Sequence, residues 1–235
     1  MHLPEITISG EEIFEVAGFP ITNTFLFGLI LSLLISILFI SSFRKAKVIP
    51  GKLQNFCEVI LEGLFNFFDS ITGNRETTKE IFPLSATLFI LILSCNLLEM
   101  LPGVGVFRFL RSPSSDLNFT VPVALLSVLY LNFLAFKKLG ISYSKKFLNF
   151  KNPILLFVGA LEGVSEISRI LSLAIRLFGN LFAGEVLLIV ISCLFAYILP
   201  LPFLALELLV AFVQALIFSS LITIFYTTAV QHGHE

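Results

Sequence analysis

The sequence predicts an all-α polytopic membrane protein with about five membrane helices, one interfacial amphipathic helix, and a last pair of helices forming a long, strongly tilted hairpin. Three observations support this fold class. Hydrophobic residues make up 57% of the 235 residues and charged residues only 13%, whereas a soluble domain has about 25% charged residues. The mean hydropathy is +0.98. Apolar segments long enough to cross about 30 Å of hydrocarbon recur along the chain.

The first three membrane segments are separated by polar stretches. They run from about Asn23 to Phe43, from about Ile81 to Leu101 and from about Leu117 to Phe136. Between the first two, apolar residues recur at three- and four-residue steps over residues 50–73, which predicts an amphipathic helix lying in the membrane interface. A short sixth span is the alternative for this segment, but it would place three carboxylates in lipid: Glu58, Glu62 and Asp69.

The last apolar region extends from Pro153 to Val230 and is divided by the sequence LPLP at 199–202. One helix over residues 153–199 would be roughly 70 Å long, which is more than the hydrocarbon thickness requires. It must therefore break, at Gly179 or Gly184, or lie strongly tilted. We expect one membrane domain over residues 1–235, made of an external segment 1–22, a three-span part 23–136 with its interfacial helix 50–73, and a helical hairpin 153–231.

Basic residues predict the orientation of the chain. Eleven of the fifteen lysines and arginines fall on one side of the five spans, within residues 44–52, 75–79 and 137–151. The positive-inside rule places that side in the cytoplasm, so the N-terminus is expected outside and the C-terminus inside. The acidic N-terminus carries no basic cluster, so no cleaved signal or transit peptide is expected. The net charge of −1 gives no indication of a nucleic-acid partner.

Arg176 lies in the middle of the fourth apolar segment. Arginine does not lose its proton at accessible pH, and its placement near the centre of a bilayer costs from about 2.5 to more than 10 kcal/mol. Such a cost indicates a function, most simply a path for a proton. On a helix, one stripe roughly 80° wide carries five polar side chains, namely Glu162, Glu166, Arg169, Arg176 and Asn180. Glu185 points almost the opposite way.

Two charged residues of this stripe allow more than one interpretation. Glu166 and Arg169 either form a buried ion pair that only stabilises packing, or they belong to the ion path. For Arg176 a static pair is less favoured, because no acid lies three or four residues away on its own helix. Any partner of Arg176 must therefore come from another element.

An ordered set of motifs resembles subunit a of F-type ATP synthases over nearly the whole chain. The motifs are FPITN at 19–23, NLLEMLPG at 96–103, PSSDLN at 113–118, LEGV at 161–164, RLFGNLFAGE at 176–185 and QALIF at 214–218. A single short match would be weak, but six in order, with a matching number of spans, make the resemblance specific. It implies a proton-conducting membrane subunit of the Fo sector.

The resemblance also implies a role for each matched residue. Arg176 would face the rotating c-ring and separate two aqueous half-channels, with Asn180 one turn away and Gln214 approaching from the last helix. Glu185 and Glu207 would line the external half-channel, where position 207 varies between Glu and His in the family. The remaining matches are Glu162 and Ser172 for the cytoplasmic half-channel and Asp116, with Asn118, for an external access motif.

The implied subunit is an ion-translocating, non-catalytic part of its complex. No GxxxxGK[ST] loop for nucleotide phosphate occurs, and the three histidines lie near the termini, so neither a cofactor nor a metal site is expected. The expected partners are the c-ring, b-type peripheral stalk subunits and membrane lipid. The expected location is a bacterial plasma (inner) membrane, with an organellar origin left open.

Two further alternatives remain at this point. The coupling ion, H⁺ or Na⁺, depends mainly on the carboxyl group of the c-ring. A secondary proton-coupled transporter would also bury arginine and glutamate, but it usually contains internal repeats around a central site. The sequence shows no convincing repeat, and the order of the motifs favours the ATP synthase subunit.

Overall fold

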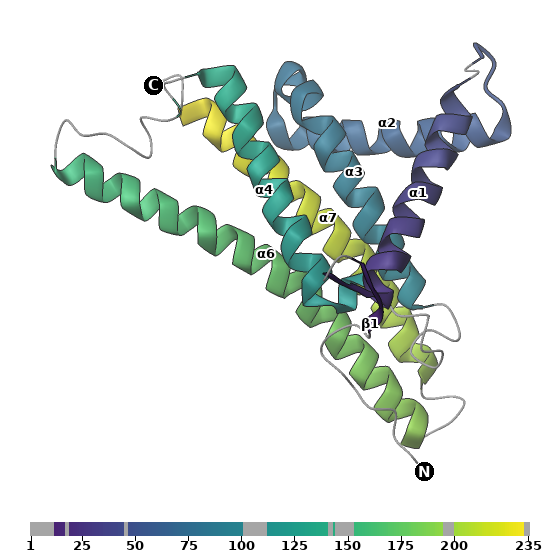
Figure 1. Ribbon diagram of the computed structural model, residues 1–235. Helices are drawn as coiled ribbons and strands as arrows, with labels where there is room; N and C mark the ends of the chain where they lie inside the picture. The colour runs from purple at the N-terminus through teal and green to yellow at the C-terminus, as the bar shows by residue number, and fades with distance from the viewer. Residues whose placement is uncertain are drawn as a thin grey trace.

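The computed structural model describes residues 12–16, 19–44, 47–100, 112–140, 143, 153–194 and 200–232. The all-α prediction is confirmed, and five of the described helices are long and apolar enough to cross a membrane. These five are α1 (Asn23–Phe43), α3 (Arg75–Glu99), α4 (Leu117–Leu139), α6 (Pro153–Leu194) and α7 (Pro200–His232) (Figure 1). The structure adds two short strands before α1, β1 (Glu12–Val16) and β2 (Phe19–Thr22), paired antiparallel with Val16 opposite Phe19.

The amphipathic segment forms helix α2 (Lys52–Thr72), which is not among the five candidate spans. It ends at Gly73, whose φ of 64° is readily adopted by glycine. The next residue, Asn74, caps α3 by accepting a hydrogen bond from the backbone N–H of Glu76 at 2.9 Å. Because of this cap, α3 begins at Arg75, earlier than the predicted Ile81. The predicted end of that segment, Leu101, lies outside the described residues.

Helix α6 is continuous from Pro153 to Leu194, through both Gly179 and Gly184. Its 42 residues correspond to about 63 Å at 1.5 Å per residue. Of the two predicted alternatives, a break or an unbroken long helix, the structure therefore has the unbroken helix. Figure 1 shows α6 and α7 running antiparallel, with α6 strongly oblique to α1 and α4. The tilt of this hairpin relative to a bilayer stays a prediction.

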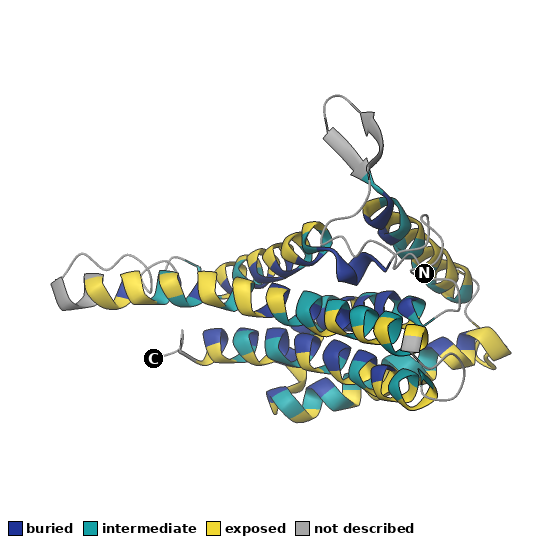
Figure 2. Ribbon diagram, turned by 90° about the horizontal axis from the view of Figure 1, so that it is seen from below, coloured by how far each residue is buried: buried dark blue, intermediate teal, exposed yellow. Residues whose placement is uncertain are grey.

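The buried core lies where α3, α4, α6 and α7 meet. Its large side chains include Ile92, Leu131, Leu177, Phe218 and Ile222. Helix α7 packs along α3, where Ser85 and Thr223 share a hydrogen bond of 2.7 Å. Most side chains of α1 and of residues 157–172 in α6 are exposed, as Figure 2 shows. The exposed apolar side chains are suited to contact with lipid. The buried side chains mark the faces on which the helices pack against one another.

Candidate functional site

Arg176 lies on the exposed side of α6, and its side chain is half-buried. Ser172 and Asn180, one turn before and one turn after it, are exposed. Within the part of the chain that the structure describes, no hydrogen bond or ion pair involves the Arg176 guanidinium. Among the described residues, the positive charge of Arg176 therefore has no counter-ion, and part of its side chain is accessible at the surface of α6.

A hydrogen bond joins α6 to α7 one turn from Arg176. The side-chain amide of Asn180 donates from Nδ2 to Oε1 of Gln214 at 2.9 Å. Gln214 is only 3% exposed, and its Nε2 has no hydrogen-bond partner among the described residues. Gln214 was expected near Arg176, and the partner that the structure gives it is Asn180. The amide pair fixes the register of α7 against the arginine face.

Glu207 is buried on α7 at the edge of a cavity between α6 and α7. The cavity has a volume of about 230 Å³ and is lined by both Asn180 and Glu207. Neither carboxylate oxygen of Glu207 has a hydrogen-bond partner within the described residues. The carboxyl group lies against Gly184, where a β-carbon would be only 2.5 Å from Oε1. Glycine at position 184 thus makes the room that Glu207 occupies.

Glu185 follows this glycine and is half-buried. Its Oε2 atom is buried and also has no partner in the described part of the chain. Glu207 lies against Gly184, the neighbour of Glu185 in the chain, so the two glutamates lie at a similar level of α6 and α7. A buried carboxylate without a partner is costly, whereas water in a cavity of this size would solvate the carboxyl group of Glu207, which lines it. The expected direct or one-water contact between the two carboxyl groups stays a prediction.

Two polar residues extend this arrangement and were not assigned a role from the sequence. Asn96 of α3 is fully buried and donates to the backbone carbonyl of Ala211 on α7 at 3.3 Å, while its Oδ1 has no partner among the described residues. The turn η1 (Pro113–Ser115) docks beside it, since Ser112 donates to the carbonyl of Cys95 at 3.0 Å. The sequence analysis used Asn96 only as part of the NLLEMLPG motif. An amide side chain within an apolar helix is the signal that could have predicted its buried polar contact.

Asp116 holds two elements together at this end of the molecule. It caps α4 by accepting from the backbone N–H of Asn118 at 2.9 Å, and its other oxygen accepts from the Thr24 hydroxyl at 2.6 Å. The side chain is fully buried. These contacts anchor the start of α1 to the start of α4. A role of Asp116 in external access stays a prediction, and its observed contacts are structural.

The residues predicted for the cytoplasmic side lie apart from the Glu185–Glu207 group. Glu162 precedes Arg176 by almost four helical turns, about 21 Å along α6, and is half-buried. Between them, Glu166 and Arg169 form an ion pair with 2.9 Å between Oε1 and Nη1. The structure therefore brings Asn180, Glu207 and Gln214 together on one side of Arg176 and leaves Glu162 on the other.

Comparison with known proteins shows the family of the chain. The family model described as ATP synthase A chain matches residues 24–227. An ATP synthase subunit a of Syntrophobacter fumaroxidans is 36% identical over 195 residues, which covers 81% of this chain and 77% of the relative. The ATP synthase subunit a of Geotalea daltonii is 34% identical over 209 residues, which covers 88% of this chain and 86% of the relative. An unbroken family match over five membrane helices, with relatives of this similarity, shows that the chain belongs to the ATP synthase A chain family.

Proposed function

We propose that this chain is the proton-conducting stator subunit of an F-type ATP synthase, located in a bacterial plasma (inner) membrane. In this proposal it provides two aqueous half-channels to a rotating c-ring, and b-type peripheral stalk subunits hold it in place. The N-terminus lies outside and the C-terminus in the cytoplasm. The chain itself contains no catalytic site, and it couples ion flow to rotation while ATP is made elsewhere in the complex.

The observation that carries the proposal is the charge of Arg176, which has no ion-pair partner among the described residues and is partly accessible at the surface of α6. A carboxyl group on a rotating partner must be neutral to face lipid and ionised to exchange its proton. A fixed guanidinium favours the ionised form as the carboxyl group passes, and it repels protons that would leak directly between two access routes. Arginine suits this position because it does not lose its own proton.

The external half-channel is assigned to the cavity between α6 and α7. Glu207 lines this cavity, and the oxygens of its carboxylate have no partner in the described part of the chain. Together with Glu185, Glu207 can relay protons through water toward the Asn180–Gln214 pair. Asn96 supplies a further buried carbonyl oxygen at the junction with α3. Asp116 contributes to the external access motif by fixing the ends of α1 and α4.

The cytoplasmic half-channel is assigned to the other side of Arg176. Ser172 is exposed one turn before the arginine, and Glu162 lies further along the same stripe. Protons would reach the c-ring along this stripe without passing Arg176. The separation of Glu162 from Glu207 along α6 and α7 therefore corresponds to two routes rather than one continuous channel.

The test is the substitution Arg176→Ala in the assembled complex. We expect ATP synthesis in inverted membrane vesicles with an imposed proton gradient to be abolished, while the complex still assembles because a charge in an apolar segment is removed rather than introduced. Arg176→Lys should fail as well, because a desolvated ammonium can lose its proton. Arg75→Ala, which removes a cation over the Phe65 ring away from α6, is the matched control. Near-normal synthesis by Arg176→Ala would contradict the proposal.

A further inference from the structure

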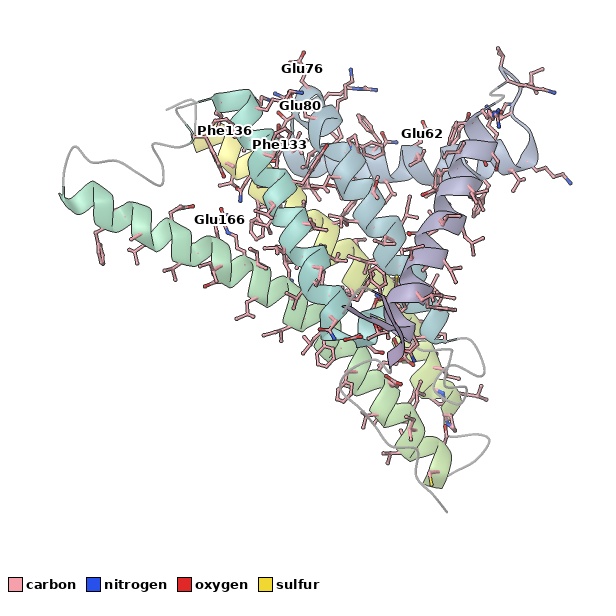
Figure 3. All side chains as sticks on the ribbon, in the orientation of Figure 1. Glu62, Glu76, Glu80, Phe133, Phe136 and Glu166 are labelled. Carbon is pink, nitrogen blue, oxygen red and sulfur yellow. The ribbon has the colours of Figure 1, made fainter. Side chains whose placement is uncertain are left out.

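Glu166 and Arg169 form a largely buried ion pair on α6 that the proposed proton routes do not use. Arg169 donates from Nη1 to Oε1 of Glu166 at 2.9 Å, and the two side chains are only 27% and 12% exposed. The second carboxylate oxygen of Glu166 accepts a long hydrogen bond, 3.5 Å, from Nδ2 of Asn132 on α4. Figure 3 shows Glu166 on the side of α6 that faces α4.

Residues from other elements hold the pair in place. The Arg169 guanidinium lies over the ring of Phe225 on α7, 4.6 Å from its centroid. Asn132 in turn accepts a hydrogen bond from the hydroxyl of Tyr143. Burial, together with the nearby Glu166 carboxylate, raises the pKa of Tyr143 to about 12. Tyr143 therefore remains a hydrogen-bond donor, and the amide of Asn132 stays directed at Glu166.

Arg169 lies close enough to Arg176 for its charge to affect protons on the same face of α6. It precedes Arg176 by two helical turns, about 10 Å along the axis, on nearly the same side of α6. At an effective dielectric constant of about 20, a unit charge about 10 Å away changes the equilibrium for placing a proton at a site by on the order of tenfold. A bare guanidinium at Arg169 would therefore repel protons in the cytoplasmic route that leads past Ser172.

We propose that Glu166 is the counter-ion that neutralises Arg169, so that Arg176 alone acts as the positive barrier on this face of α6. This inference rests on the proposed function, because it assumes that protons move along the stripe on the cytoplasmic side of Arg176. Glu166 is then a positioning residue that acts through Arg169 and does not itself carry the proton. The contacts from α4 and α7 keep the two charges paired.

The test compares Glu166→Gln with the double substitution Glu166→Gln/Arg169→Gln in the assembled ATP synthase. Passive proton conduction through the membrane sector and ATP synthesis are measured in vesicles and expressed per assembled complex. We expect Glu166→Gln to lower both rates by on the order of tenfold, because Arg169 is left unpaired. The double substitution removes both charges and should restore the rates to within about twofold of the unmodified complex.

A matched control removes the acid of another ion pair. Glu80 on α3 accepts from Lys138 at 2.6 Å, away from α6, so Glu80→Gln should leave conduction unchanged. If the Glu166–Arg169 pair were only a packing contact, the double variant would be at least as impaired as Glu166→Gln, and the proposal would be wrong. Wild-type rates in Glu166→Gln would also overturn it.

Arg176→Ala, measured in parallel, distinguishes failure of this inference from failure of the proposed function. Loss of synthesis in Arg176→Ala with no rescue in the double variant refutes only the counter-ion role of Glu166. Retained synthesis in Arg176→Ala refutes the proton routes themselves, and the counter-ion role with them.

Discussion

Gly184→Ala is expected to impair proton conduction without reducing the stability of the protein. A β-carbon at position 184 would lie 2.5 Å from Oε1 and 3.3 Å from the carboxyl carbon of Glu207. Ordinary contacts of this kind are about 3.4 Å or longer, so the carboxyl group must retreat by about 1 Å. The helix itself gains from the change, because alanine is more stable than glycine in a helix by about 0.5–1 kcal/mol.

The size of the functional effect follows from the side chain that must move. Displacing Glu207 from its rotamer costs about 0.5–1.5 kcal/mol, which corresponds to roughly a two- to tenfold lower population of the present geometry. The carboxyl group lines the cavity between α6 and α7, so conduction through the external half-channel should fall by the same factor. The amount of assembled complex should change little, because the gain in helix stability and the cost of displacing Glu207 are of similar size.

The assay is passive proton conduction in vesicles, together with ATP synthesis driven by an imposed gradient. Gly163→Ala is the matched control, because it lies on the same helix and a β-carbon there would meet nothing within 4 Å. In a Glu207→Asp background the shorter side chain avoids the new methyl group, so Gly184→Ala should cause little additional loss. Unchanged conduction in Gly184→Ala, or equal losses in Gly184→Ala and Gly163→Ala, would refute the reasoning.

Two further predictions concern stability. Asp116→Ala should destabilise the detergent-solubilised protein by about 2 kcal/mol, because a helix cap and a hydrogen bond are lost. Adding Thr24→Val should cost little more, because Thr24 and Asp116 share that hydrogen bond. Additive losses in the denaturation midpoints of the two single variants would contradict this. Burial raises the pKa of Tyr143 to about 12, so the neutral hydroxyl contributes stability below pH 10 that is lost between about pH 10 and 12. Tyr143→Phe should therefore show a smaller alkaline drop in melting temperature than the unmodified protein, and an identical drop would disprove the assignment.

The sequence by itself determined the class of protein and the number of candidate spans, and it singled out Arg176 for a functional prediction. In lipid, every backbone polar group must be satisfied within its own segment, so long apolar runs form helices. The segment predicted from Asn23 to Phe43 matches α1 residue for residue. Arg176 stood out for the same reason, because a charge in an apolar segment is too costly to be incidental.

The tertiary structure decided which faces meet. Helical periodicity places Glu166 and Arg169 on one side of α6, but it does not reveal that Asn132 and Phe225 meet them there. The same holds for the hydrogen bond between Asn180 and Gln214, which are 34 residues apart in the chain. Periodicity describes one helix at a time, whereas these contacts depend on how three helices cross.

The pocket for Glu207 was decided in the same way. Gly184 was read from the sequence as a possible break in a long helix, yet α6 passes through it unbroken. Its missing side chain serves instead to admit the carboxyl group of Glu207 from α7. A glycine in a helix weakens that helix wherever it occurs, so only the position of the neighbouring helix shows what the missing side chain makes room for.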